Sequence, residues 1–302
     1  MNQEMQKEIE LWKKKRRAVI FAHYYQRPEI QAVADLVGDS LELARAAAET
    51  DADVIVLCGV HFMAESAALL ASEKQVLLPE AGAGCPMADM VTEKALAEWK
   101  EKNPKAVIVA YVNTSAAVKA LSDICCTSAN AVKVVASLPD EQEVLFLPDR
   151  NLGGYVIRQT GREMELWPGW CNTHEWVTQE DVLAAKKAHP GALVLVHPEC
   201  CAAVANLADH IASTAGMVRF AAASAATEFI VVTESGILER FSKTCPEKSF
   251  YLATPKLVCP NMKLTRLSSV LRALETMSPV IRVSEDLRAP ALTSLTRMLK
   301  LG

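Results

Sequence analysis

The feature that most limits how this chain can fold is an internal repeat marked by three cysteines. Cys85, Cys171 and Cys259 are 86 and 88 residues apart. Upstream of each lies an apolar run, AVIFAH, AVIVAY or ALVLVH, and the runs end at rings spaced by 88 and 86 residues: His23, Tyr111 and His197. Similarity at a fixed period is the signature of a repeat architecture. The sequence therefore predicts three copies of one module, each supplying one thiol from the same place.

Two further positions recur with the same spacing. An aspartate follows each ring, and a hydroxyl side chain stands five residues after each aspartate. These positions are Asp35, Asp123 and Asp209 for the aspartates, and Ser40, Ser128 and Thr214 for the hydroxyls. Because Ser and Thr are favoured N-caps, we expect each hydroxyl to begin a helix. Chance placement of cysteines would not also bring these residues to matching offsets.

Within each copy, short apolar runs alternate with stretches of helical periodicity. We expect strands in the first copy at residues 18–22, 53–58 and 75–78, in the second at 107–110, 144–147 and 163–167, and in the third at 193–196, 229–232 and 250–252. Alternating strands and helices indicate parallel sheets with right-handed crossovers.

We therefore predict an α/β fold of three homologous α/β sandwich modules, with parallel sheets around a pseudo-threefold axis. The modules are expected at residues 1–86, 87–172 and 173–260. Residues 261–302 resemble the opening of a further module that stops early. We expect this C-terminal tail to pack back on the first module.

Charge and hydropathy exclude several classes of protein. A net charge of −4 and a pI near 5.9 leave no basic footprint for nucleic acid. No stretch of about 18 uncharged apolar residues is long enough to span a membrane, and the N-terminal segment lacks the apolar core of a signal peptide. We expect a cytoplasmic protein whose nine cysteines serve as thiols or metal ligands and not as disulfides.

The three matched cysteines are candidate metal ligands. Each follows the last strand of its module, and ligands of parallel α/β sheets bind beyond the carboxyl ends of the strands. We interpret Cys85, Cys171 and Cys259 as ligands of a [4Fe–4S] cluster, because three thiolates leave one iron free to act as a Lewis acid on substrate oxygens. The alternative is three buried structural cysteines. The other six cysteines lack the threefold match and are expected to pack in the core: Cys58, Cys125, Cys126, Cys200, Cys201 and Cys245.

Polar side chains near the strand ends are candidates for acid–base chemistry and binding. Glu199 stands just past a strand, where a carboxylate is costly unless it is used, and we interpret it as a general acid/base. Tyr25 is a further candidate for proton transfer. His23 and His197 are candidates because both end equivalent strands. A helix N-terminus presents free N–H groups and a partial positive charge, so the three hydroxyl-bearing helix starts suit anionic substrate groups.

Taken in order, these residues resemble the quinolinate synthase family. The resemblance covers nearly the whole chain. It rests on motifs that include AHYYQ at 22–26, GDS at 38–40, CPMA at 85–88, YVN at 111–113, CTSAN at 126–130, PDRNLG at 148–153, HPEC at 197–200 and CPNMK at 259–263. Some family members carry a Cys-x-x-Cys-x-x-Cys run around the third ligand, whereas this chain has Cys259 alone there.

The resemblance implies that iminosuccinate (iminoaspartate) condenses with dihydroxyacetone phosphate to quinolinate, with release of phosphate and water, in de novo NAD biosynthesis. It implies a [4Fe–4S] cluster on Cys85, Cys171 and Cys259. An L-aspartate oxidase or dehydrogenase is then the expected upstream supplier. Substrate contacts are implied from His23, Ser40, Tyr111, Asn113, Ser128, His197, Glu199 and Thr214.

Three other functions remain open at this stage. A hydro-lyase would use the same kind of open iron on another substrate, and its product would distinguish it. An iron–sulfur sensor or electron carrier predicts a fully ligated cluster and no cavity lined by His, Tyr and Glu. A zinc-stapled binding protein would be recognised by its metal content.

Overall fold

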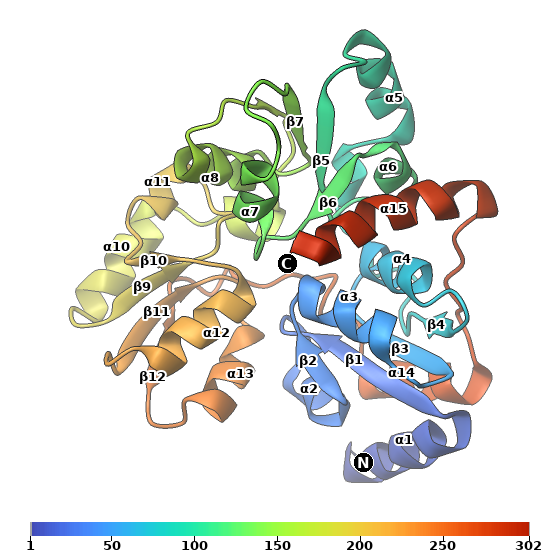
Figure 1. Cartoon of the computed structure of the whole chain (residues 1–302). Helices are drawn as coiled ribbons and strands as arrows, with labels where there is room; N and C mark the ends of the chain where they lie inside the picture. The colour runs from blue at the N-terminus through green and yellow to red at the C-terminus, as the bar shows by residue number, and fades with distance from the viewer. Residues whose placement is uncertain (1, 302) are drawn as a thin grey trace.

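Three four-stranded parallel sheets form the framework of the computed structural model, which describes residues 2–301. The first sheet has the order β2-β1-β3-β4, and the other two repeat it as β6-β5-β7-β8 and β10-β9-β11-β12. The strands are β1 (Ala18–His23), β2 (Leu36–Gly38), β3 (Val54–Cys58), β4 (Gln75–Leu77), β5 (Val107–Tyr111), β6 (Ile124–Cys126), β7 (Val144–Leu147), β8 (Glu165–Leu166), β9 (Leu193–Val196), β10 (His210–Ile211), β11 (Glu228–Val232) and β12 (Ser249–Leu252). The predicted α/β fold of three repeated modules is confirmed (Figure 1).

Helices cover the sheets, and β3 and β7 are buried along their whole length as strands enclosed on both faces are. The first module has α1 (Asn2–Arg16), α2 (Pro28–Val33), α3 (Ser40–Glu49) and α4 (His61–Leu70), followed by the short 3-10 helix η1 (Ala88–Met90). The second has α5 (Glu93–Lys102), α6 (Ala116–Leu121), α7 (Ala131–Ala136) and α8 (Arg150–Thr160). The third has α9 (Asn172–Glu175), α10 (Gln179–Ala188), α11 (Ala202–Ala205), α12 (Thr214–Ala223) and α13 (Ile237–Thr244).

The three recurring aspartates make the same contact in each module. A carboxylate oxygen accepts the backbone N–H of the residue fifteen positions earlier, which lies in the first strand. The pairs are Ile20 with Asp35 at 2.7 Å, Ile108 with Asp123 at 2.8 Å and Val194 with Asp209 at 2.8 Å. Because one side-chain contact recurs at equivalent positions, the repeat extends from the sequence into the hydrogen bonding.

Each sheet has one strand more than the sequence predicted. The extra strands β2, β6 and β10 have three, three and two residues. Runs this short carry no detectable periodicity, and Val37, which continues the helical spacing of Ile30 and Val33 in the sequence, lies in β2. The recurring aspartate stands just before each extra strand and fastens the chain beside the first strand of the sheet.

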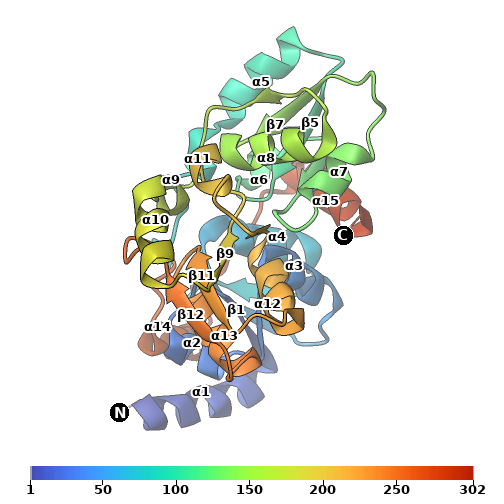
Figure 2. The same ribbon diagram turned by 90° about the vertical axis from the view of Figure 1, so that its left-hand side faces the viewer.

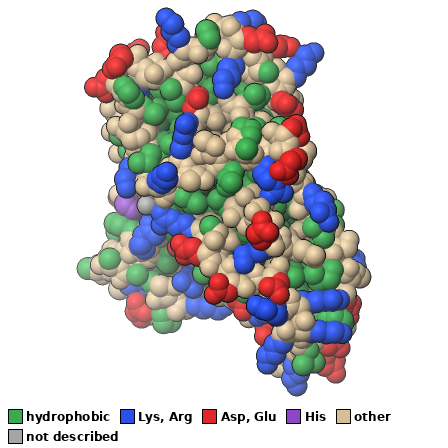
Figure 3. Space-filling model, turned by 45° about the vertical axis from the view of Figure 1, so that its right-hand side comes forward, with side chains coloured by type: hydrophobic (Ala, Val, Ile, Leu, Met, Phe, Trp, Pro, Cys, Tyr) green, Lys and Arg blue, Asp and Glu red, His purple; other side chains and the backbone are tan. Residues whose placement is uncertain are grey.

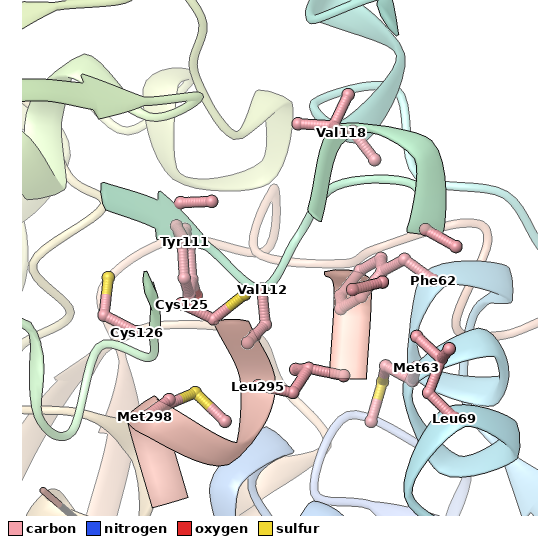
Figure 4. Close-up of a cluster of buried hydrophobic side chains, with 14 of the residues drawn as sticks. Phe62, Met63, Leu69, Tyr111, Val112, Val118, Cys125, Cys126, Leu295 and Met298 are labelled. Atoms are coloured by element: carbon pink, nitrogen blue, oxygen red, sulfur yellow. The ribbon is translucent and has the colours of Figure 1, made fainter. Parts of the chain in front are cut away.

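The C-terminal tail contains α14 (Leu267–Thr276) and α15 (Glu285–Leu301), and the two helices pack in different places. Helix α14 lies on α1, in the first module, whereas α15 lies mainly against α6 and β6 of the second module and also touches α4 (Figure 1). Leu295 and Met298 of α15 stand among apolar side chains of both modules (Figure 4). Between the two helices, Val280 forms one isolated antiparallel bridge with Leu77 at the edge of the first sheet. The module boundaries stay a prediction.

The second module and helix α1 lie at opposite ends of the molecule (Figure 2). On the face shown in Figure 3, acidic and basic side chains are interspersed, without a field of one sign. Within residues 2–301, no helix is both long enough and apolar enough to cross a lipid bilayer.

Candidate active site

A cavity of about 120 Å³ lies between the three modules and is lined by every residue that the sequence predicted as catalytic, substrate-binding or metal-ligating. Strand ends deliver the three rings, because His23 and Tyr111 are the last residues of β1 and β5, and His197 directly follows β9. The predicted residues that line the cavity are His23, Tyr25, Ser40, Cys85, Tyr111, Asn113, Ser128, Cys171, His197, Glu199, Thr214 and Cys259. The roles assigned to them stay predictions.

The two histidines are held in the same way. Nδ1 of His23 accepts the N–H of Tyr25 at 3.1 Å, and Nδ1 of His197 accepts the N–H of Glu199 at 3.3 Å. Both rings are almost fully buried. Burial is the main cause that lowers the pKa of each ring to about 3, against the charge of Glu199, which raises it. The imidazoles are therefore neutral at pH 7, and since Nδ1 is the acceptor, Nε2 carries the proton.

Glu199 is a buried carboxylate with two close partners. The hydroxyl of Tyr111 donates to its Oε1 at 2.7 Å, and Nδ1 of His174 lies 2.7 Å from its Oε2. Burial opposes ionisation, but His197, His174 and the hydrogen bond from Tyr111 outweigh it and lower the pKa of Glu199. An ionised Glu199 can accept a proton where little water competes.

The hydrogen bonding continues from Glu199 to the opposite wall. Nε2 of His174 lies 2.9 Å from Oγ1 of Thr233, and that oxygen lies 2.7 Å from the hydroxyl of Tyr25. If His174 donates through Nδ1 to the carboxylate, then its Nε2 accepts from Thr233 and Thr233 accepts from Tyr25. Burial raises the pKa of both Tyr25 and Tyr111, so the phenols keep their protons and serve as donors.

This chain of hydrogen bonds also explains a possible metal-binding trio. Donor atoms of Cys171, His174 and Glu199 lie within 4.8 Å of one another, and they are the only such group of three among the described residues 2–301. Nδ1 of His174 lies 3.3 Å from the Cys171 sulfur as well as close to the carboxylate. Direct hydrogen bonds therefore account for the short distances.

The three matched thiols reach the cavity from the loops that follow β4, β8 and β12. Burial raises the pKa of Cys85 to about 12 and also raises the pKa of Cys171 and Cys259, while backbone amides nearby act in the opposite direction. Without a bound cation the thiols therefore keep their protons at pH 7. Within residues 2–301, no other cysteine lines this cavity.

The six remaining cysteines lie elsewhere. Cys58, Cys125 and Cys126 belong to buried strands, and Cys200 and Cys245 are also buried. Although Cys200 adjoins Glu199, its sulfur donates to the carbonyl of Val232 at 3.7 Å. Cys201 is partly exposed and joins the core cluster of the third module. These positions agree with the expected packing role.

The prediction that the recurring hydroxyls cap helices is wrong. Helix α3 is capped by Asp39, whose carboxylate forms a capping box with Glu42, and α12 is capped by Ser213. Ser40 and Thr214 each stand one position later, as the first residue of the helix, so neither side chain is needed as a cap. Ser128 precedes α7 by three positions. All three line the cavity, where their hydroxyls are free for a ligand.

Two residues of the hydrogen-bonded chain were not proposed from the sequence. His174 stands three residues after Cys171, and no role was assigned to it from the sequence. Thr233 directly follows β11, so its place at the end of a core strand was the available signal. Threonine is common in β-strands, so its presence there gave no functional signal. Only the fold brings it to Tyr25 and His174.

The fold and the cavity define an α/β enzyme whose buried acid–base site is assembled from three repeated modules. Residues 7–300 match the family model described as Quinolinate synthetase A protein. A quinolinate synthase of Geobacter sp. (strain M21) is 55% identical over 300 residues, which are 99% of this chain and 98% of that protein. One of Desulforudis audaxviator (strain MP104C) is 53% identical over 301 residues, which are 100% and 99% of the two chains. The chain belongs to the quinolinate synthase family, and its activity lies in NAD biosynthesis.

Proposed function

We propose that this chain condenses iminosuccinate with dihydroxyacetone phosphate to quinolinate, with release of phosphate and water, and that a [4Fe–4S] cluster on Cys85, Cys171 and Cys259 takes part. The observation that carries the proposal is the shared cavity, since the three thiols and the buried carboxylate of Glu199 line the same small space. The family gives the product, and the cavity supplies the groups that such a condensation needs.

The donor set fits an iron–sulfur cluster. Thiolates are the ligands that such clusters select, and clusters are normally held by four of them. Here three cysteines line the cavity within residues 2–301, so one iron would remain open. Their sulfurs are not all within 4.8 Å of one another, whereas tetrahedral coordination of a single zinc ion would bring thiolates to about 3.8 Å. When bound, the cluster would supply a Lewis-acid iron that polarises substrate hydroxyl or carbonyl oxygens.

The protein's own groups would move the protons. Glu199 would accept a proton from a substrate carbon or hydroxyl, and His174 and Tyr111 hold its oxygens in place. Tyr25, whose hydroxyl lies 2.7 Å from Oγ1 of Thr233, would donate a proton to a leaving hydroxyl. Each dehydration needs one proton accepted and one donated. The two ends of the chain of hydrogen bonds offer both.

The carboxylates and the phosphate of the substrates would bind at the helix starts. Ser40 and Thr214 are the first residues of α3 and α12, and both line the cavity. The first N–H groups of a helix and its partial positive charge favour anions. Asn113 adds a buried Oδ1 with no hydrogen-bond partner in the protein, and such an oxygen suits a substrate hydroxyl or amine donor.

The test is an anaerobic assay of the reconstituted chain with both precursors, with quinolinate identified as the product and iron and sulfide counted. Ala in place of Cys85, Cys171 or Cys259 should remove both the cluster and the activity, because no other cysteine lines the cavity. Cys245→Ala is the matched control and should retain both. A Cys85→Ala protein with a full, active cluster would refute the ligand assignment.

The source of iminosuccinate follows from its chemistry. This imine is an oxidised form of aspartate and hydrolyses in water, so an L-aspartate oxidase or dehydrogenase would supply it close to where it is used. We place both enzymes in the cytoplasm. Supply by a co-purified aspartate-oxidising enzyme, measured as quinolinate formed from aspartate and dihydroxyacetone phosphate, tests this coupling.

A further inference from the structure

Two buried carboxylates outside the acid–base chain stand at equivalent places in the second and third modules. Asp149 lies two residues after the end of β7, and Glu234 lies two residues after the end of β11. Both are fully buried. Asp149 belongs to the PDRNLG motif at 148–153 but was given no role there, Glu234 was not noted in the sequence, and neither residue lines the cavity.

Each carboxylate holds the backbone of a cavity cysteine. Oδ2 of Asp149 accepts the N–H of Cys171 at 3.1 Å, and Oε1 of Glu234 accepts the N–H of Cys259 at 3.2 Å. The other oxygen of each side chain binds the start of the next helix. Oδ1 of Asp149 accepts the N–H of Leu152 at 2.7 Å, and Oε2 of Glu234 accepts the N–H of Gly236 at 2.7 Å. One side chain thus ties a cysteine loop to a rigid helix end.

The first module lacks this device. Val60 occupies the equivalent place, two residues after the end of β3, and it makes no side-chain hydrogen bond to α4. The loop before Cys85 is held differently, since the side chain of Asn261 donates to the carbonyl of Gly84 at 2.8 Å. Cys85 therefore serves as an internal reference for the other two cysteines.

The two carboxylates also differ in their charge partners. Nζ of Lys263 lies 2.9 Å from Oε1 of Glu234, and it also donates to the carbonyl of Tyr25 at 2.6 Å. Asp149 has no cationic side chain at ion-pair distance among the residues described. Its oxygens instead accept backbone amides, including that of Leu152.

We infer that Asp149 and Glu234 are positioning residues, which fix the backbone of Cys171 and Cys259 so that both thiols face the cluster site before any iron arrives. The inference rests on the proposed cluster for its purpose, but the positioning itself is a property of the iron-free chain. A carboxyl oxygen that accepts a buried amide N–H satisfies a donor that water does not reach, and loss of that oxygen leaves the amide unpaired.

The experiment compares thiol reactivity in the iron-free chain, measured for each cysteine by mass spectrometry after brief alkylation. Asp149→Ala should raise the rate at Cys171, and Glu234→Ala should raise the rate at Cys259, each by about tenfold, as expected when one buried hydrogen bond is lost and its amide is left unpaired. The rate at Cys85 should stay unchanged in both variants. Thr92→Ala, which removes the N-cap of α5 at a residue that does not line the cavity, is the control.

Site-selective changes would support the inference. An unchanged alkylation rate at the cysteine whose N–H the replaced carboxyl group bound would overturn it. An equal rise at all three cysteines would overturn it too, because a merely structural role would loosen the whole site. Asp149→Asn and Glu234→Gln keep one acceptor oxygen and fold more readily. They should give smaller rises with the same selectivity, and the same criterion decides if the alanine variants do not fold.

A second measurement uses the reconstituted enzyme. The rate at which a chelator removes iron should rise several-fold in both alanine variants and should match wild type in Thr92→Ala. Equal rates in all of these proteins would contradict a positioning role. If the wild-type chain takes up no cluster, the cluster proposal fails, whereas the alkylation rates still decide the inference about Asp149 and Glu234.

Discussion

The neutral state of His23 and His197 predicts a specific sensitivity to acid. Their pKa is lowered to about 3 by burial in the folded chain, whereas an unfolded histidine titrates near 6.5. Below pH 6.5 the unfolded chain therefore binds more protons, so stability is fully present above that pH and is lost as the pH falls. The loss continues until the pH reaches the folded value near 3.

The size of the effect follows from these values. Between pH 7.5 and pH 5.5, one buried histidine that stays neutral should lower the free energy of unfolding by about 1.4 kcal/mol, and the pair by about 3 kcal/mol. His23→Asn removes one titrating group but keeps an oxygen that can accept the N–H of Tyr25. The drop in that variant should therefore be smaller by about 1.4 kcal/mol. His197→Asn should behave alike.

The assay is urea unfolding of the iron-free chain at the two pH values, followed by far-UV circular dichroism. His61→Asn is the control, because half of that side chain is exposed (49%) and lies outside the cavity. The quantity to compare is the difference in unfolding free energy between the two pH values for each protein. If His23→Asn and His197→Asn lose as much stability on acidification as the wild type, the neutral burial of these rings is refuted.

Four further substitutions test the site. Glu199→Gln keeps the shape but removes the proton acceptor, so the iron content should stay and kcat should fall by roughly 10²-fold or more; full activity would exclude an acid–base role. Ser213→Ala removes the cap of α12 and should lower the stability by about 1 kcal/mol without changing KM. Thr214→Ala should raise KM and leave the melting temperature unchanged. The opposite pattern would show that Thr214 is the cap. A Cβ at Gly236 would lie 2.6 Å from the carbonyl oxygen of Tyr24. Gly236→Ala should therefore displace the loop that carries Tyr25, lower the stability by about 1–3 kcal/mol and lower kcat. A variant with the melting temperature and rate of the wild type would show that the loop moves without cost.

The sequence was most informative where one physical requirement recurs three times. Buried parallel strands need apolar runs, so the first, third and last strands of each module, in chain order, were predicted within about two residues, the precision expected of such boundaries. Rings that end equivalent strands had to meet at one place if the modules surround an axis. His23, Tyr111 and His197 do line one cavity.

The sequence was least informative where a contact depends on the packing of one module against another. The positions equivalent to Thr233 in the other two modules are Gly59 and Pro148, which carry no hydroxyl, so the repeat does not mark Thr233. Its partners Tyr25 and His174 are also far from it in the sequence. The caps failed for a different reason. A carboxylate at Asp39 and a hydroxyl at Ser213 stand one residue before the recurring positions and satisfy the helix ends first.

The five residues of the hydrogen-bonded chain, which begins and ends at a tyrosine, come from all three modules: Tyr25 from the first, Tyr111 from the second, and His174, Glu199 and Thr233 from the third. No single module therefore supplies all five residues of this chain of hydrogen bonds, and no pair of modules does either. The proposed site needs all three modules packed together, just as a site between subunits needs the oligomer. The catalytic rate of this chain would therefore measure how well its modules are packed. A separated module is therefore expected to contribute nothing to turnover, and mixing the missing pieces back would be the means of restoring it.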